Sequence, residues 1–252
     1  MYYIHAFAIT VLLLVTIQYV LTAYIFPKKA KKTLENQLKN HPNYKRLKKI
    51  EALFNQLYKR SYANFSSYSD RKNFNIKSNE FIYGEIDFLS FFSILKKTNP
   101  QPGEVFYDLG SGSGKAVFAA ALCFELSESL GIELLPALFK KSNRQLERVK
   151  TLILHHDRDF SDTYLARIAS IHFFNENILH HDYSNADILY IAATCFSEET
   201  WNKLIAQFAC LKSGTRIIVT SKSIHNQQFV SIHSHAELMS WGLCTVNIYK
   251  KI

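Results

Sequence analysis

The stretch "VFYDLGSGSGKAVFAAA", residues 105–121, decides the fold. Its first five residues are mostly apolar and predict a buried strand, and "KAVFAAALCFEL" (115–126) predicts the helix that follows. Three glycines separate the two elements, at Gly110, Gly112 and Gly114. Glycine lacks a Cβ, so this backbone can turn sharply and approach a ligand closely. The pattern predicts a strand, turn and helix of an open α/β sheet, which binds ligands beyond the carboxyl ends of its strands.

The rest of the chain from about residue 80 repeats this alternation of apolar runs and helical patterns. Strands are predicted at 129–134, 171–178, 186–193 and 214–221. Helices are predicted from about Pro136 to His155 and over 197–211. The last apolar runs, 229–234 and 243–251, fit a terminal antiparallel pair. Successive strand and helix units of this kind predict an α/β fold with a largely parallel sheet.

The glycine turn fits neither of the two common phosphate motifs. A triphosphate loop needs Ser or Thr after Gly-Lys, but Ala116 stands there, and Leu109 occupies the place of its first glycine. A dinucleotide turn needs its third glycine at Lys115. The simplest alternative is a tight turn that binds nothing.

Two carboxylates favour a ligand at this turn. Asp108 ends the first strand, where its charge disfavours a pyrophosphate, and Glu133 ends the next strand, where an acidic side chain accepts hydrogen bonds from ribose hydroxyls. An adenosine that carries a cationic amino-acid tail satisfies both carboxylates. The sequence therefore predicts S-adenosylmethionine as the cofactor.

Several segments in the same order resemble the Dot-one type (disruptor of telomeric silencing) histone lysine methyltransferases. They are "IYGEIDFLSFFSIL" (82–95), "VFYDLGSGSGKAVFAAA", "LGIEL" (130–134) and the run from Ala186 to Ile224. The resemblance covers roughly residues 80–250. It implies a class I methyltransferase fold, a Rossmann-like, mostly parallel seven-stranded sheet flanked by helices. It also implies methyl transfer from S-adenosylmethionine to a protein lysine.

The resemblance assigns cofactor-binding roles to twelve residues. The loop of Tyr83, Gly84 and Glu85 is expected to close over the methionine end of the cofactor. The centre is expected to be lined by Asp108, Gly110, Ser111, Gly112, Gly114 and Lys115. Glu133 is expected to bind the ribose, and Asn177 and Ile178 are expected at the adenine.

The acceptor side departs from the family pattern. Where the family has Asn-Asn-Phe after the fourth strand, this chain has Ala192, Ala193 and Thr194. Thr194 either replaces the lost amide acceptor or only caps the backbone. Tyr83 and Phe196 are expected to form apolar walls that lower the pKa of an amine nucleophile. The catalytic candidates are therefore Tyr83, Thr194 and Phe196, and no general base is identified.

The N-terminal segment predicts a membrane anchor. Residues 4–26 contain no Lys, Arg, Asp or Glu and are long enough to cross a bilayer as a helix. A cleaved signal peptide is less favoured, because no basic residue precedes the apolar run. "PKKAKK" (27–32) follows, so the body is expected to face the cytoplasm. The predicted parts are an anchor (1–27), a basic helical linker (28–79) and the methyltransferase domain (80–252).

The formal charge of +9 is concentrated beside this anchor. Residues 28–60 hold eleven Lys and Arg against Glu35 and Glu51, which leaves residues 61–252 formally neutral. Anionic lipid is therefore the expected partner of residues 28–60, and nucleic acid is less favoured. A helical spacing of apolar residues predicts an amphipathic helix here, at Leu47, Ile50, Phe54, Leu57 and Tyr58.

Two further features limit the function. The four cysteines show no C-x-x-C pair, so neither a zinc site nor a disulfide framework is predicted, and the His-His-Asp runs at 155–157 and 180–182 lack spaced ligand partners. Two alternatives to a lysine methyltransferase stay open. One is methylation of a membrane-associated small molecule, and the other is a non-catalytic membrane scaffold that binds the cofactor.

Overall fold

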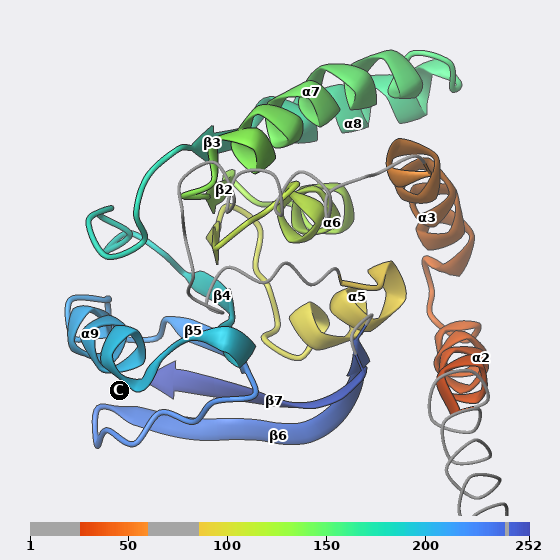
Figure 1. Cartoon of the computed structure of the whole chain (residues 1–252). Helices are drawn as coiled ribbons and strands as arrows, with labels where there is room; N and C mark the ends of the chain where they lie inside the picture. The colour runs from red at the N-terminus through yellow and green to blue at the C-terminus, as the bar shows by residue number, and fades with distance from the viewer. Residues whose placement is uncertain (1–25, 60–85, 240–241) are drawn as a thin grey trace, which may run out of the picture. The chain divides into compact units, whose positions relative to one another are not determined.

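The computed structural model describes residues 26–59, 86–239 and 242–252 (Figure 1). The chain divides into two compact units between Tyr44 and Lys45. The first unit contains helix α2 (Phe26–Leu38), in which Lys28, Lys29 and Lys32 are exposed. Residues 4–25 of the predicted span lie outside the described ranges. Within those ranges, none of the helices combines the length and the apolar character that a bilayer crossing requires.

Helix α3 (Tyr44–Tyr58) is the amphipathic helix that the spacing predicts. All five of the predicted apolar positions are buried. The second compact unit begins at Lys45 and therefore includes this helix, which the sequence pattern had assigned to the linker. Part of its charge is also used within the unit, since Arg46 donates to the Tyr164 hydroxyl at 2.7 Å and Lys49 pairs with Asp157 at 3.4 Å.

The second unit is built on a seven-stranded sheet, whose strands lie in the order β3-β2-β1-β4-β5-β7-β6 (Figure 1). Among the described strands only β7 runs antiparallel, so the predicted mostly parallel sheet and terminal antiparallel pair are confirmed. The strands are β1 (Val105–Leu109), β2 (Glu128–Ile132), β3 (Ile171–Phe174), β4 (Ile188–Ala192), β5 (Arg216–Thr220), β6 (Phe229–Met239) and β7 (Gly242–Lys251).

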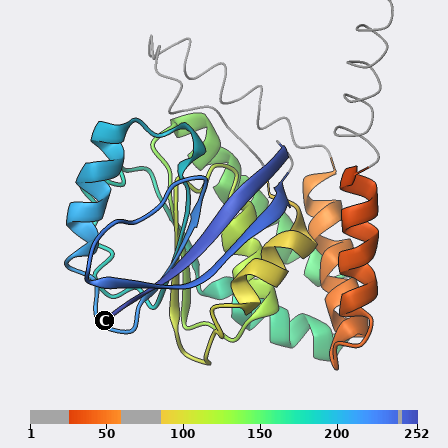
Figure 2. The same ribbon diagram turned by 90° about the horizontal axis from the view of Figure 1, so that it is seen from below.

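Helices cover both faces of this sheet, as Figure 2 shows from below. On one face, α9 (Glu198–Phe208) packs Trp201, Leu204 and Phe208 onto alternate residues of the central strands. On the other face, α5 (Phe88–Lys96) and α6 (Lys115–Cys123) cover the remaining alternate residues. Helix α7 (Pro136–Ile153) packs on the sheet at β3, and α8 (Arg158–Ala169) packs against α6 and α7. With both faces buried, the strands are nearly continuous apolar runs, as a parallel sheet requires.

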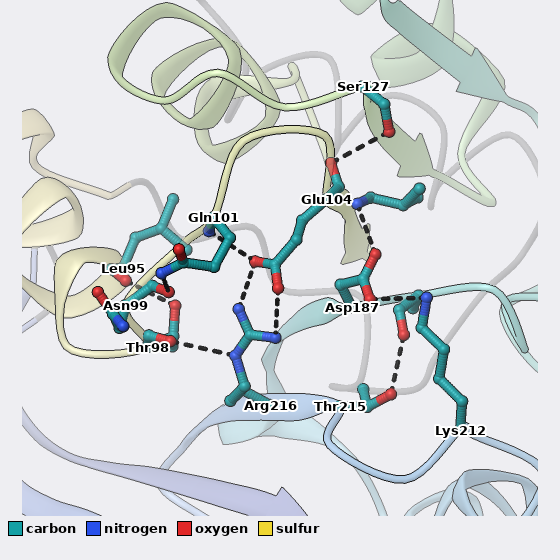
Figure 3. Close-up of polar contacts among 12 residues, drawn as sticks. Leu95, Thr98, Asn99, Gln101, Glu104, Ser127, Asp187, Lys212, Thr215 and Arg216 are labelled. Carbon is teal, nitrogen blue, oxygen red and sulfur yellow. Dashed lines mark hydrogen bonds and ion pairs between the residues drawn. The ribbon is translucent and has the colours of Figure 1, made fainter.

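The amino ends of β1, β4 and β5 are held together by a polar network (Figure 3). Arg216 forms a two-pronged ion pair with Glu104 and donates from Nε to the Thr98 carbonyl oxygen at 3.1 Å. The Asp187 carboxylate accepts from the Val105 backbone N–H at 2.9 Å and pairs with Lys212 at 2.6 Å. These contacts fix the register of the three strands, and hence align their opposite, carboxyl ends.

Helix α8 is an element of the described chain that the sequence pattern does not predict. Asp157 caps it, because its carboxylate accepts from the Phe160 backbone N–H at 3.1 Å. Phe160, Tyr164 and Ile168 are four residues apart and all buried, so they form one apolar stripe. In the sequence, the polar run His155-His156-Asp157 directly before α8 gives no sign that an apolar stripe follows. Asp157, the last residue of this run, is the residue that caps the helix.

Candidate active site

The glycine turn joins β1 to α6 in a conformation that suits glycine. Gly110, Gly112 and Gly114 have φ values of 90°, 54° and 85°, in the left-handed region that other residues rarely adopt. The backbone N–H groups of Gly110 and Ser111 both donate to the Ile132 carbonyl oxygen at 2.9 Å. The turn is thereby tied to the end of β2, beside the predicted ribose-binding residue.

Two of the glycines in this region are required by close packing. A Cβ at Gly114 would lie 2.6 Å from the Phe173 ring, and one at Gly131 would lie 2.7 Å from both Phe173 and the Ser111 hydroxyl oxygen. Phe173 of β3 is therefore a site residue that sequence reasoning missed. At Gly110 the surroundings are open, since a Cβ would meet no described atom within 4 Å. The turn thus leaves space on its outer side.

Asp108 lies where β1 ends, with only 3% of its surface exposed. Burial raises the pKa of its carboxyl well above the ordinary value, and the nearby Glu133 carboxylate raises it further. A buried carboxylate of this kind is stabilised by a cation placed beside it. The structure therefore places at residue 108 a group that gains from binding a positive charge.

Glu133 follows directly after β2 and is also buried. Its two carboxylate oxygens accept from the backbone N–H groups of Gly112, at 2.8 Å, and Leu135, at 2.7 Å. The side chain therefore links the glycine turn to the start of α7. The prediction that Asp108, the turn and Glu133 lie together at one sheet edge is thus met by the geometry of β1 and β2, which pair in parallel.

The loop after β3 reaches the same edge. Asn175, which sequence reasoning missed, donates its side-chain amide to the carbonyl oxygens of Glu133 and Leu134, at 2.8 and 3.0 Å. The Asn177 side-chain oxygen accepts from the Leu179 backbone N–H at 2.9 Å, which makes a local turn. Ile178 is partly buried against the core under α9. Asn175 therefore ties the loop that carries the two predicted adenine residues to the end of β2.

The carboxyl ends of β4 and β5 carry a group of hydroxyls. Thr194, in a short 3-10 helix (Ala193–Cys195), lies with its Oγ1 3.0 Å from the Ser221 Oγ. Ser221 has a φ of 66°, which is unusual for a residue other than glycine and stores backbone strain. Such strain is common at ligand sites, so Ser221 joins Thr194 as a candidate that the sequence alone does not distinguish.

Two buried hydroxyls lie on the same strands. Tyr190 of β4 pairs with Asp108 of β1, and its ring packs on Phe91 of α5 at a centroid distance of 5.1 Å. Burial and then the Asp108 carboxylate raise the pKa of Tyr190 well above its usual value. The Tyr190 hydroxyl and the Thr220 Oγ1 have no hydrogen-bond partner among the described residues. Buried hydroxyls without partners mark a place where a polar ligand can bind.

Over residues 58–243 the chain matches the model of the family described as "Histone methylation protein DOT1". The chain belongs to this DOT1 family. The match covers most of the chain and confirms the resemblance found in the sequence. Membership of the DOT1 family also confirms S-adenosylmethionine as the cofactor of the site.

Curated relatives of this chain are named "Histone-lysine N-methyltransferase, H3 lysine-79 specific". The one from Yarrowia lipolytica is 29% identical over 184 residues, 72% of this chain and 36% of that protein. The one from Debaryomyces hansenii is 30% identical over 168 residues, 65% of this chain and 14% of that protein. The chain therefore spans a minor part of the length of each relative.

Solved structures agree with the fold of this chain. TrmN from Thermus thermophilus superposes with a TM-score of 0.52 at 15% identity, covering 69% of this chain and 52% of that one. A geranyl diphosphate methyltransferase in complex with S-adenosylmethionine gives a TM-score of 0.50 at 12% identity, covering 66% and 85%. At such low identity these likenesses show the fold alone, and they confirm the class I methyltransferase fold.

Two observations show that the residues of this chain fit the cofactor. The Asp108 carboxyl is buried beside a second carboxylate, and the surroundings of Gly110 are open. The sulfonium and ammonium groups of the cofactor carry the positive charge that stabilises the buried Asp108 carboxylate. The open surroundings of Gly110 allow a ligand to contact the backbone there. The Lys115 Nζ lies 4.9 Å from the centroid of the Tyr58 ring on α3.

Three of the predicted site residues lie outside the described residues. They are Tyr83, Gly84 and Glu85. The described chain resumes at Ile86, and Asp87 then caps α5 by accepting from the backbone N–H groups of Leu89 and Ser90. Phe196 is partly buried and packs against the core under α9. In the described ranges, no three His, Cys, Asp or Glu side chains are grouped so as to hold a metal ion.

Proposed function

We propose that this chain transfers a methyl group from S-adenosylmethionine to the amine of a protein lysine. The observation that carries the proposal is the arrangement of Asp108 and Glu133 around the glycine turn, in a chain matched to the DOT1 family over residues 58–243. The curated relatives are named as histone H3 lysine methyltransferases. A histone lysine is therefore the first acceptor to test.

The bound cofactor supplies an electrophilic methyl group on a sulfonium. The protein must place an uncharged amine in line with that methyl and exclude water from both. Asp108 and Glu133 hold and orient the donor, while the space above β4 and β5 receives the acceptor. Tyr190 and Thr220 on these two strands are buried, and burial of an acceptor amine beside them would favour its neutral form.

The acceptor side of the proposed site is built from hydroxyls instead of amides. Ala192 and Ala193 offer no polar side-chain atom, but the Thr194 and Ser221 hydroxyls lie 3.0 Å apart at the adjacent strand ends. Each hydroxyl has lone pairs that can accept from an ammonium or amine N–H. We assign to this pair the orientation of the acceptor nitrogen.

A transfer assay tests the activity. The full-length protein, incubated with cofactor that carries a tritiated methyl group, is expected to label recombinant nucleosomes or a protein band of a native membrane extract. Label on lysine, found by peptide sequencing, supports the proposal. If label appears only in the lipid fraction, the acceptor is a small molecule of the membrane. Binding of the cofactor without transfer to any fraction indicates a non-catalytic scaffold.

The apolar segment at residues 4–26 supports a membrane location with the domain facing the cytoplasm. We propose that this segment anchors the chain and that exposed lysines of α2 bind anionic lipid headgroups. In the full-length chain, Leu12→Arg combined with Leu14→Arg is expected to move the protein from the membrane pellet to the supernatant, because each arginine costs about 2.5–3.5 kcal/mol inside a bilayer. Unchanged fractionation after both substitutions would contradict the anchor.

A further inference from the structure

The end of α3 lies directly against the cofactor turn. Tyr58, the last residue of this helix, donates its hydroxyl hydrogen to the Ser113 carbonyl oxygen at 3.0 Å. The Lys115 Nζ lies 4.9 Å from the centroid of the same tyrosine ring. Two successive parts of the turn, the carbonyl before Gly114 and the side chain after it, are therefore held by one residue from a distant part of the chain.

The hydrogen bond from Tyr58 reaches a carbonyl oxygen of a buried residue. Ser113 is fully buried, and a buried carbonyl oxygen without a hydrogen bond destabilises the conformation that contains it. Lys115 also starts α6, where the helix dipole disfavours a positive charge. A cation–π contact with the electron-rich face of the Tyr58 ring offsets this unfavourable interaction with the helix dipole. Tyr58 thus stabilises the turn at two points.

The position of Tyr58 is itself fixed by α7. The Leu57 carbonyl oxygen accepts from the Gln145 side-chain amide at 3.2 Å and from the Arg148 guanidinium at 3.1 Å. A second nitrogen of Arg148 donates to the Gln56 carbonyl oxygen at 3.2 Å. These carbonyls belong to the last turn of α3, where the carbonyl oxygens have no N–H donors within the helix. The α7 side chains therefore cap α3 and leave Tyr58 little freedom to move.

The ring of Tyr58 also packs among aromatic neighbours. Its centroid lies 4.8 Å from that of Phe54 in α3 and 6.3 Å from that of Phe118 in α6. Tyr58 is 8% exposed, so the contact with the turn is made inside the domain. All of α3 before Tyr58 precedes the region matched to the DOT1 family, which begins at residue 58.

From these contacts we infer that Tyr58 is a positioning residue for the cofactor turn. It holds Ser113 and Lys115 so that Gly110 and Gly112 present the conformation that binds S-adenosylmethionine; this inference rests on the cofactor site proposed above. The residue acts through the turn and does not touch the reacting atoms. The contacts that Tyr58 makes at the end of α3 therefore contribute to the affinity of the site for its cofactor.

Tyr58→Phe in the full-length chain tests the inference. The substitution removes the hydrogen bond to Ser113 and keeps the ring beneath Lys115. Calorimetry with S-adenosylhomocysteine is expected to give a dissociation constant about three- to tenfold higher than that of the wild type, the effect of losing one net hydrogen bond. Tyr58→Leu, which also removes the ring, is expected to increase the dissociation constant further.

The matched control is Tyr164→Phe. It removes another hydroxyl contact between α3 and the domain, the 2.7 Å bond from Arg46 Nε, at a place remote from the turn in the sequence and on a different helix. This variant is expected to lower the melting temperature while its dissociation constant for S-adenosylhomocysteine stays within about twofold of the wild-type value. Amide hydrogen exchange at residues 110–115 is expected to accelerate in Tyr58→Phe and to stay unchanged in Tyr164→Phe.

The two ideas fail in different ways. If the wild type does not bind S-adenosylhomocysteine, the proposed cofactor site and the inference both fall. If the wild type binds, and Tyr58→Phe loses thermal stability but binds with unchanged affinity, then Tyr58 has a structural role only and the inference is wrong. A weaker affinity in Tyr58→Phe alone supports it.

Discussion

Asp108 shows why the site is built for a cation. Its carboxyl is buried beside the Glu133 carboxylate, and both features raise its pKa. In a fold without ligand, such a group destabilises the protein once it ionises, because the unfolded chain carries the same charge at less cost in water. The side chain is therefore explained by ligand binding and not by stability.

A substitution at this residue makes the destabilisation measurable. Since the folded-state pKa of Asp108 is raised, its ionisation subtracts stability as the pH rises from about 4 through the raised pKa. Asp108→Asn stays neutral at every pH. Without cofactor, the melting temperature of this variant relative to the wild type is expected to increase as the pH rises from about 4 up to the raised pKa of Asp108. A difference that does not change with pH would contradict the buried charge.

Gly114 combines two requirements that can be separated experimentally. Its φ of 85° and the Phe173 ring, 2.6 Å from where a Cβ would lie, both exclude a side chain. Gly114→Ala is expected to destabilise the fold by about 2–5 kcal/mol in denaturant unfolding, the sum of backbone strain and overpacking. It is also expected to weaken cofactor binding, because the turn must shift.

Gly103 supplies the control for this prediction. It has a similar φ of 83°, but a Cβ there meets nothing within 4 Å. Gly103→Ala is expected to cost only the strain, about 1–2 kcal/mol, and to leave the affinity for the cofactor unchanged. Equal losses of stability in the two variants would show that Phe173 does not restrict the turn.

Residue types in sequence were sufficient to find the two carboxylates and the glycines, because strand ends and turn residues leave local patterns. They were not sufficient to find Phe173, Asn175, Ser221 or Tyr58 as parts of the site. Each of these acts through a contact between elements that are far apart in the chain, such as the 2.8 Å bond from Asn175 to the Glu133 carbonyl oxygen. Such contacts have no local signal.

Among the elements, the parallel strands depend on the polar network at their amino ends. Glu104 and Arg216 link the segments that lead into β1 and β5, and their side chains are only 17% and 12% exposed. A pair this buried is costly to break, because the remaining charge has no partner and little water. The network therefore holds the strands whose opposite ends carry Asp108, Thr194 and Ser221.

Glu104→Gln tests this role. The variant is expected to lose about 2–3 kcal/mol of unfolding free energy in urea, less than the roughly 3–5 kcal/mol of a fully buried pair, because Gln still accepts a hydrogen bond. The control is Glu199→Gln, which breaks an exposed pair with Lys203 and is expected to cost less than about 0.5 kcal/mol. Equal costs would contradict the structural role of the Glu104 pair.

Helix α8 illustrates what limits prediction of elements. Its apolar stripe consists of Phe160, Tyr164 and Ile168, interrupted by charged side chains, so its periodicity is weak in the sequence. Packing of the stripe on α6 and α7 stabilises it in the fold. The longer elements were predictable because each carries a strong apolar period of its own.

For the whole molecule, the positions of the strands along the chain, the mostly parallel sheet, the class I methyltransferase fold and the cofactor were all predictable from sequence. Burial of the five predicted apolar side chains joins α3 to the second compact unit. Spacing predicts that this face is buried but cannot say against which surface. The methyl acceptor is equally hard to predict from spacing, because its recognition depends on a surface formed by separate strands.

Asp108 and Glu133 together are expected to bind S-adenosylmethionine at the carboxyl ends of β1 and β2, and every other role assigned to the site depends on this. Calorimetric titration of the wild type, Asp108→Asn and Glu133→Gln with S-adenosylmethionine at about pH 8 tests it most directly. We predict saturable binding to the wild type and at least about a tenfold weaker affinity in each variant, as expected when a charge-assisted hydrogen bond is lost. Absence of binding to the wild type, or unchanged affinity in both variants, would contradict this assignment.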